Sequence, residues 1–262
     1  GGFDAYSDEM LKYCMQDTVV SAKVYEYQEK FRNKNAKSVK MEHKVAEIIA
    51  EQTENGFCFD LKRAERLEQD LLMHKVSTED DMQTIFPDEV KERWSDKTGK
   101  RLKDKVTVFN PGSRQQIASR LNNKYGWNYP TTDKGNPKVD RTVLSKLSYP
   151  EAQVLVQYFD NTKLMSQVSD WIIRSRASRD GKIHGSLNTL GTVTGRMSAN
   201  NPNMQQVSGD KRARSLFIPD KNWVLLGADL SGLELRMLAH YLEKYDGGAY
   251  ADQILNGDIH TH

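Results

Sequence analysis

The sequence has little cysteine and no long apolar run, and each absence excludes a class of protein. Its 262 residues include two cysteines, Cys14 and Cys58, which lie far apart and form no C-x-x-C pair. This spacing argues against both a disulfide framework and a zinc site. No apolar stretch is long enough to cross a bilayer, and no signal-peptide pattern is present. These absences favour a soluble globular protein in a reducing cytoplasm.

The sequence also lacks a large excess of charge of one sign. Its 38 Lys and Arg residues are nearly balanced by 36 Asp and Glu residues, which leaves a formal net charge of +2. The overall charge therefore does not indicate a polyanionic partner. Two local stretches, Lys30–Lys44 and Lys97–Lys105, are nevertheless rich in Lys and Arg. Such stretches are either solvated faces or nucleic-acid contacts, and both interpretations remain open.

The residues before Gly181 carry mostly helical patterns. Ser7 is a candidate N-cap for an amphipathic helix that continues to Tyr27, and a second helix is expected from Met41 to Thr53. Between them, Lys30–Ser38 has the composition of a linker. Further expected elements are a short strand at Phe57–Phe59, a long helix capped by Asp60 with Leu67, Leu71 and Leu72 on its apolar face, a hairpin turning at Thr98 and Gly99, a helix that begins at Asn110 or Ser113, and a helix after Tyr149 and Pro150.

The pattern changes after Gly181. "KIHGSLNTLGTVTGRMS" has the composition of strand, turn and strand, and the apolar run Trp223–Leu226 predicts a buried strand that feeds a helix. The fold class is therefore α+β, with a helical region of about 150 residues followed by the opening of an α+β domain. The sequence starts at Gly1 without methionine and stops at His262 inside what reads as a continuing element, so we expect a fragment of a longer polypeptide.

Asp229 follows the apolar run directly and opens an amphipathic stretch. A carboxylate at the carboxyl end of a buried strand suits a divalent metal ion that carries substrate phosphates. The same residue would also serve as the N-cap of the helix that follows. The residue alone does not decide between a metal ligand and a cap.

Glu234 lies among the apolar residues Leu233, Leu235 and Leu238 of the same stretch. A buried unpaired carboxylate is costly, so this acid is expected to be either paired or used in function. A structural ion pair with Arg236 is the alternative to a functional role.

Several motifs in collinear order carry a resemblance to one family. "DLSGLELRMLAH" is similar to motif A of family A DNA polymerases, in the form of the replicative polymerases of podovirus-type phages. "TVTGRMSANNPNMQQV", the "RSLF" of Arg214–Phe217 and "NGDIHT" resemble further palm and fingers motifs. "FNPGSR" and "TKL" resemble the thumb segments that grip the primer-template, and Tyr13 and Asp17 in "YCMQD" resemble the third motif of the 3'-5' exonuclease.

The resemblance implies template-directed attack of a primer 3'-hydroxyl on the α-phosphate of a deoxynucleoside triphosphate. Asp229 would bridge two Mg²⁺ ions, with the backbone carbonyl of Leu230 as a further ligand. Ser231, Glu234 and His260 would contact the incoming nucleotide, with Glu234 as a steric gate against a 2'-hydroxyl. For His260 the alternative is a metal pair with His262.

The resemblance also implies a set of DNA contacts. Arg196 would test correct pairing at minor-groove acceptors, assisted by Asn203 and Gln205, with Thr194 shaping the turn. Asn203 and Gln205 would otherwise only satisfy loop backbone. The residues expected to contact phosphates are Asn110, Ser113, Arg114 and Lys163, with Ser113 alternatively a helix cap.

The implied domains are the last exonuclease helix at 1–30, the thumb region at 31–180, and at 181–262 the antiparallel-sheet palm running into the fingers. The second palm carboxylate and the nucleotide-binding fingers helix have no position here, so the chain alone is expected to be inactive as a polymerase. Asp17 would lack its exonuclease partners as well. Only the short basic segment Lys97–Lys105 stands where some phage relatives carry a large insertion, so a thioredoxin-type host processivity factor is not expected.

Two other functions remain in view. One is a DNA-binding subunit of a split polymerase, and the other is a single-subunit RNA polymerase relative, which Glu234 and the Tyr13 and Asp17 pair argue against. The interpretation is a phage-type DNA-directed DNA polymerase that acts in the host cytoplasm on primer-template DNA and deoxynucleoside triphosphates, with no membrane partner.

Overall fold

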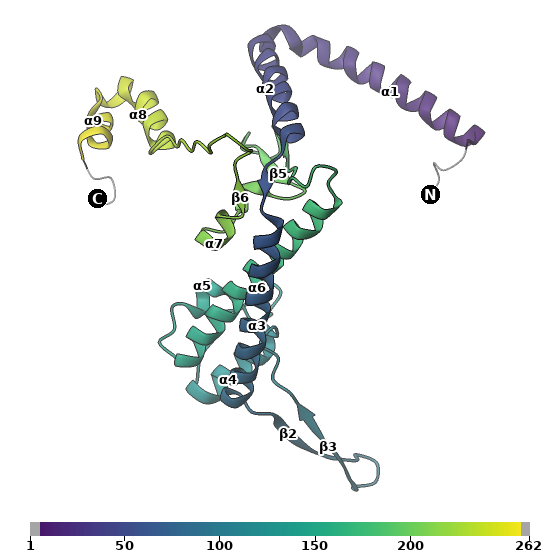
Figure 1. Cartoon of the computed structure of the whole chain (residues 1–262), viewed down its shortest axis with the longest axis vertical. Coiled ribbons are helices and arrows are strands. Elements are labelled where there is room, and N and C mark those ends of the chain that lie inside the picture. Colours follow the sequence, from purple (N-terminus) through teal and green to yellow (C-terminus); the bar gives the residue numbers. More distant parts are fainter. Residues whose placement is uncertain (1–5, 258–262) are drawn as a thin grey trace. The chain divides into compact units, whose positions relative to one another are not determined.

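The computed structural model describes residues 6–257, which belong to two compact units, Gly1–Ile218 and Pro219–His262. The helices of the first unit are α1 (Asp8–Arg32), η1 (Asn33–Asn35), α2 (Ala36–Asn55), α3 (Leu61–Ile85), α4 (Arg114–Tyr125), α5 (Arg141–Leu144), α6 (Pro150–Ala177), η2 (Met204–Gln206) and α7 (Lys211–Arg214). Its strands are β1 (Cys58–Phe59), β2 (Glu89–Trp94), β3 (Arg101–Thr107), β4 (Ser186–Asn188), β5 (Ser198–Asn200) and β6 (Phe217–Ile218), and the second unit holds α8 (Leu233–Asp246) and α9 (Ala249–Asn256) (Figure 1).

The first helix begins as the sequence predicts, whereas the second begins at Ala36, five residues before the predicted Met41. The Ser7 hydroxyl accepts a hydrogen bond from the backbone N–H of Met10 at 3.1 Å, which is N-cap geometry. The linker expected at Lys30–Ser38 is wrong, because only the 3₁₀ turn η1 separates α1 from α2. Lys, Arg and Ala are good helix formers, so a polar composition did not prevent helix formation there. Gly56 ends α2 with a positive φ of 60°.

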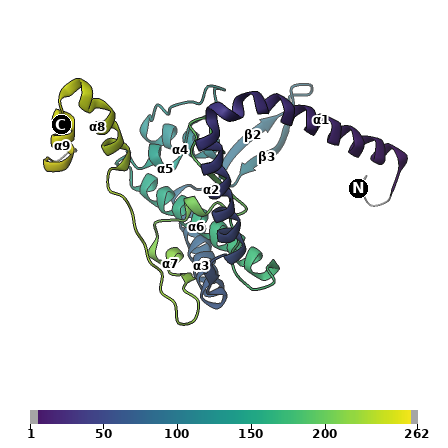
Figure 2. The same cartoon turned by 90° about the horizontal axis from the view of Figure 1, so that it is seen from above.

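The long helices α3 and α6 form the central pair of the first unit, and Figures 1 and 2 both show them side by side. The Asp60 carboxylate caps α3 by accepting from the Arg63 N–H at 3.0 Å, and Pro150 occupies the first turn of α6. The two helices bury one apolar cluster together with β1 and β6, which includes Leu67, Leu71, Leu164, Val168, Trp171 and Leu216. Leu72, expected on the same face, is instead half exposed, because it is adjacent to Leu71 and adjacent residues on a helix point in different directions.

A second apolar cluster lies where α3 ends and α4 packs against the first half of α6. It includes Met82, Phe86, Phe109, Ile117, Leu121, Leu144 and Leu155. Ser113, not Asn110, is the N-cap of α4, because its hydroxyl accepts from the Gln116 N–H at 3.4 Å. The Gln116 side chain accepts in return from the Asn110 N–H at 2.7 Å, so two free donors at this helix start are satisfied.

The described strands form three antiparallel pairs, β1 with β6, β2 with β3, and β4 with β5. The hairpin turn at Thr98 and Gly99 and the strand, turn and strand after Gly181 are therefore confirmed. Long helices together with small antiparallel sheets confirm the α+β class. Among the described helices, none combines the length and the apolar character that crossing a bilayer requires.

In the second unit, the buried strand predicted at Trp223–Leu226 is wrong. These four side chains are between 59% and 93% exposed, and none of the described strands includes them. An apolar run becomes a strand only when a neighbouring strand accepts its backbone hydrogen bonds and a second layer covers its side chains. Neither is present among residues 219–257, where Ala239 and Ile254 are the buried apolar side chains.

Candidate functional site

The segment around Asp229 has no regular secondary structure, and α8 begins only at Leu233. Gly232 is the N-cap of α8, with a left-handed backbone at φ 60° and ψ 30° that glycine adopts at little cost. The alternative interpretation of Asp229 as the cap of this helix is therefore wrong. Asp229 and Leu230 are exposed and line a shallow open hollow with Glu234.

Glu234 lies in the first turn of α8 and is exposed, whereas we expected a carboxylate buried among leucines. Leu233 and Leu235 are its neighbours in sequence, but adjacent residues on a helix point in different directions. Arg236, the expected ion-pair partner, donates from Nε to the backbone carbonyl of Ser231 at 2.9 Å. That contact holds the Ser231 backbone against the start of the helix and leaves the hydroxyl of Ser231 exposed.

A divalent metal site would need more donors than this segment supplies. No group of three or more His, Cys, Asp or Glu side chains comes together within residues 6–257. Hard divalent cations take about six oxygen ligands, of which Asp229 and the Leu230 carbonyl would provide two. The donor chemistry suits magnesium, but the described residues do not form a complete site. His260, the predicted nucleotide contact, and His262 lie outside the described residues.

The loop that carries Arg196 is closed by a threonine that sequence reasoning missed. The Thr192 hydroxyl accepts from the Arg196 N–H at 2.9 Å and lies 3.0 Å from the Thr194 hydroxyl. Gly195 allows the turn with a positive φ of 76°. Thr194 therefore shapes the turn together with Thr192, and Arg196 lies exposed at its end. The T-x-x-G pattern of a side-chain-closed turn was the available signal.

Asn203 and Gln205 follow this loop but differ in their contacts. The Asn203 side-chain oxygen accepts from the Gln205 N–H at 3.0 Å and so caps η2. That oxygen therefore satisfies loop backbone, as the structural alternative predicts. The Gln205 side chain is exposed and makes no hydrogen bond to another described residue.

Gln167 on α6 anchors the next stretch of this segment and was also missed. Its side-chain amide donates to the Gln206 carbonyl at 2.8 Å and accepts from the Ser208 N–H at 3.0 Å. A polar residue on the exposed side of a long helix gives no sequence signal for such a contact.

Three of the four predicted phosphate contacts meet at the start of α4. Asn110 and Ser113 are occupied in part by local bonds, since the Asn110 side chain accepts from the Gly112 N–H at 2.8 Å and Ser113 is the helix cap. Arg114 is exposed and has no acid partner among the described residues. The fourth, Lys163, lies apart from them on α6.

Lys163 lines an open hollow of about 850 Å³ between α3, α6 and the segment 206–212. The two other strong cations there are neutralised, because Arg141 pairs with Asp160 at 2.7 Å and Arg212 pairs with Asp210 at 2.7 Å. Lys163 has no such partner among the described residues. It is therefore the cation of this hollow that is available to an anion.

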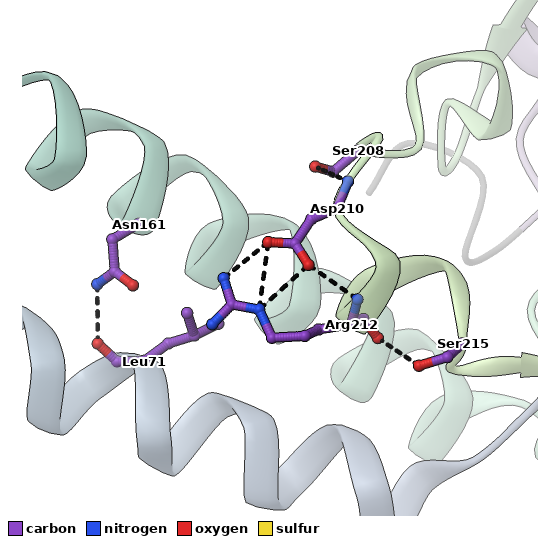
Figure 3. A network of polar contacts seen from close by, with 6 residues as sticks. All are labelled: Leu71, Asn161, Ser208, Asp210, Arg212 and Ser215. Atoms are coloured by element: carbon purple, nitrogen blue, oxygen red, sulfur yellow. Dashed lines mark hydrogen bonds and ion pairs between the residues drawn. The ribbon is translucent and has the colours of Figure 1, made fainter.

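Figure 3 shows how the Asp210 pair fixes the wall of the hollow. The Asp210 carboxylate accepts from the backbone N–H of Arg212 at 2.8 Å and from its guanidinium, and so caps the short helix α7. The Arg212 guanidinium holds the pKa of the Asp210 carboxyl below its ordinary value. Across the hollow the Asn161 side chain donates to the Leu71 carbonyl at 2.9 Å, which ties α6 to α3.

Tyr13 and Asp17 lie one turn apart on α1, and both are exposed. Positions i and i+4 share one helix face, so the structure places the two side chains on the same side. No residue of α1 is buried.

Comparison with known proteins gives the chain a family. The model of DNA polymerase family A matches residues 82–262. The DNA-directed DNA polymerases of Enterobacteria phage T3 and Escherichia phage T7 are each 30% identical over 349 residues, which cover 98% of this chain and 49% of the relative. The aligned stretch is longer than the chain, so these relatives carry residues that have no counterpart here. The chain spans about half the length of these two relatives.

Two further relatives are bacterial. DNA polymerase I of Pseudomonas aeruginosa is 34% identical over 149 residues, which cover 53% of this chain and 16% of the relative. A solved structure of the POL domain of Pol1 from M. smegmatis, in complex with DNA primer-template and dNTP, matches with a TM-score of 0.54 and 21% identity. It covers 73% of this chain and 32% of that one, and it supports the fold. Because the family model matches more than half of its residues, the chain belongs to DNA polymerase family A.

Proposed function

We propose that this chain is the thumb and first palm segment of a phage-type DNA-directed DNA polymerase, with the end of an exonuclease domain before it. The proposed boundaries are 1–30 for the exonuclease helix, 31–180 for the thumb and 181–262 for the palm running into the fingers. The observation that carries the proposal is Asp229, an exposed carboxylate in an irregular segment within the family match, ahead of a helix that has its own glycine cap.

The proposed role of Asp229 follows from its donor chemistry. A carboxylate that caps no helix and lies exposed beside the Leu230 carbonyl offers two hard oxygen donors to Mg²⁺. When bound, the metal ions would supply charge stabilisation for the reacting phosphate. The remaining ligands would come from outside the described residues, so we propose that this chain does not polymerise DNA by itself.

We propose that Ser231, Glu234 and His260 contact the incoming deoxynucleoside triphosphate. Glu234 lies in the first turn of α8, five residues after Asp229, and lines the same hollow. A carboxylate at this position would clash with a ribose 2'-hydroxyl, and the carboxylate would also lose part of its solvation. The expected consequence is a preference for deoxynucleotides over ribonucleotides.

The proposed DNA contacts divide by the chemistry they offer. Arg114 and Lys163 are exposed cations without an acid partner among the described residues, which suits phosphate contacts that depend on salt. Asn110 and Ser113 would position the phosphate backbone from the same turn as Arg114. Arg196, with Thr194, Asn203 and Gln205 around it, is proposed to contact base-pair edges in the minor groove.

We further propose that Tyr13 and Asp17 are the remnant of the third exonuclease motif and that the protein acts in the host-cell cytoplasm. Their shared face on α1 is consistent with one site. A thioredoxin-type processivity factor is not part of the proposal, because only the short hairpin β2–β3 lies between α3 and α4.

The test is primer extension with magnesium by the full-length product of the gene that encodes this chain. Asp229→Ala is expected to abolish extension, and Asp252→Ala, the same change at an exposed acid of α9, is expected to leave it intact. Glu234→Ala is expected to admit ribonucleotides, whereas Glu243→Ala on the same helix is not. Normal extension by Asp229→Ala would refute the proposed function, and an open frame that ends at His262 would favour the split-polymerase alternative.

A further inference from the structure

The hairpin β2–β3 separates its charges by face. In the antiparallel register, Lys91 pairs with Lys105 and Arg93 pairs with Leu102, while Val90 pairs with Val106 and Trp94 pairs with Arg101. Directly paired residues share a face, and so does every second residue along a regular strand. The register shifts by one residue between Lys91 and Arg93, where β3 carries the extra residue, so the face is followed along β2 and across the pair of Lys91 and Lys105. Lys91, Arg93 and Lys105 therefore lie on one face, which we call the cationic face.

The acids of the hairpin are engaged elsewhere. Glu92 and Asp104 both lie near the Arg101 guanidinium, at 3.4 Å and 3.2 Å. Glu89, the acid on the cationic face, pairs with Arg120 of α4 at 3.3 Å. Each acid among the strand residues of this hairpin therefore already has a cation.

The three cations of the cationic face have no acid within the described part of the chain that neutralises them. Lys91, Arg93 and Lys105 are all exposed, and none of them makes an ion pair or a side-chain hydrogen bond with another described residue. Like charges directly opposite each other destabilise an antiparallel pair, and Lys91 faces Lys105 in this way. The cationic face thus carries a local cost in the isolated chain that a bound polyanion would remove.

We propose that the cationic face of this hairpin is a second DNA-binding surface, which holds the phosphate backbone of duplex DNA without reading its sequence. A two-stranded ribbon fits the width of the major groove, and Lys and Arg side chains are the usual phosphate contacts. The surface is distinct from the proposed contacts at Arg114 and Lys163, and Figure 1 shows the hairpin extending beyond α4.

A nucleic acid fits this surface better than an acidic protein does. The ion pair between Glu89 and Arg120 anchors the hairpin base to α4, which carries Arg114 at its start. Arg114 and the residue that anchors the hairpin base therefore lie on the same helix, so a duplex that contacts Arg114 would pass close to the hairpin. That a duplex reaches this unit rests on the proposed function, whereas binding to the hairpin needs no catalysis.

The experiment measures the affinity of the 262-residue chain for a fluorescent DNA duplex over a range of salt concentrations. The test variant is the triple change Lys91→Gln, Arg93→Gln and Lys105→Gln. The matched control is Lys12→Gln, Lys23→Gln and Lys62→Gln, which removes the same charge from exposed residues of α1 and α3. Both variants have the same net charge, so they separate the position of the charges from their number.

The hairpin variant is expected to bind the duplex about tenfold more weakly and to lose about two to three units of the slope of log K against log salt, since each phosphate contact contributes about 0.9. The control variant is expected to stay within about twofold of the unchanged chain. Equal affinities of the hairpin and control variants would overturn the proposal.

Two further measurements separate a loss of DNA binding from a loss of folding and from a general loss of polyanion binding. Thermal unfolding of the hairpin variant is expected at or above the temperature of the unchanged chain, because the change removes the repulsion between Lys91 and Lys105. Polyglutamate serves as the probe of an acidic protein surface, and a loss of polyglutamate binding with unchanged duplex binding would overturn the DNA proposal. Duplex binding is measured without nucleotides or primer extension, so a failure of the proposed catalytic function leaves this measurement independent.

Discussion

Both units of this chain contain runs of apolar sequence, but they use them differently. In the first unit, α3 and α6 bury Leu71, Val168 and Trp171 against each other and close two apolar clusters. In the second unit, the run Trp223–Leu226 stays exposed, and α8 buries Ala239 alone among its residues. The difference teaches that the proposed DNA-binding residues lie on a unit with well-packed apolar cores. The proposed catalytic residue lies on a segment whose covering layer is absent from the described residues.

The largest difference in the free energy of unfolding should appear when one tryptophan in each unit is replaced by alanine. Trp171 is 1% exposed, whereas Trp223 is 74% exposed. Trp171→Ala is expected to lower the free energy of unfolding by about 3 to 5 kcal/mol through lost burial and the cavity left behind. Trp223→Ala should change it by less than about 0.5 kcal/mol. Chemical unfolding followed by circular dichroism measures both, and similar losses would show that the Trp223 segment is packed in solution.

A smaller effect is expected at the buried carboxylate that joins α4 to α6. Glu151 is 8% exposed and accepts from Lys124 at 2.5 Å and from the Tyr125 hydroxyl at 2.6 Å. Burial alone would raise the pKa of Glu151, but the hydrogen bonds from Lys124 and Tyr125 bring it below its ordinary value. Glu151→Gln should cost about 1 to 3 kcal/mol of unfolding free energy, since it leaves a cation poorly compensated.

The pH dependence gives the control for that change. A folded-state pKa below the unfolded value means that the stabilisation is present above the unfolded pKa and is lost as the pH falls through the folded pKa. The difference between the unchanged chain and Glu151→Gln should therefore shrink in acid. Glu243→Gln, the same change at an exposed position of α8, should have no measurable effect at any pH.

The smallest effect is expected where β4 approaches the end of α2. His184 contacts Asp180 through Nε2 at 3.0 Å and the Thr53 carbonyl through Nδ1 at 2.8 Å. The hydrogen bond to Asp180, and then that to Thr53, raise the pKa of His184. A raised folded-state pKa stabilises the fold below the unfolded value of about 6.5, and the gain is lost as the pH rises through the folded pKa.

His184→Gln should therefore lower the free energy of unfolding more at about pH 5 than at about pH 9. The difference should be less than about 1 kcal/mol, because the side chain is partly exposed to screening solvent. The melting temperature should accordingly fall more in acid than in base. Melting curves of the two proteins at both pH values give the comparison. A larger difference in base than in acid would contradict the assigned charge of His184.

Local signals were the reliable part of the sequence analysis. Ser7, Asp60 and Ser113 were each predicted at a helix start, and each side chain accepts the expected backbone N–H. Caps depend on three or four consecutive residues, so the sequence holds all the information they need. Positions that depend on a distant partner could not be obtained in this way, and the exposure of Leu72 and Glu234 and the contacts of Gln167 are examples.

The sequence by itself determined the family, the order of the long helices and the two hairpins of the first unit, and the residue types proposed for chemistry. Motif spacing and capping are properties of neighbouring residues, and these survive without any tertiary contact. Only the tertiary structure decided which apolar residues are buried and that Lys91, Arg93 and Lys105 share one face of a hairpin. The physical reason is that burial, strand pairing and register require a second segment, and a local pattern does not specify which segment that is.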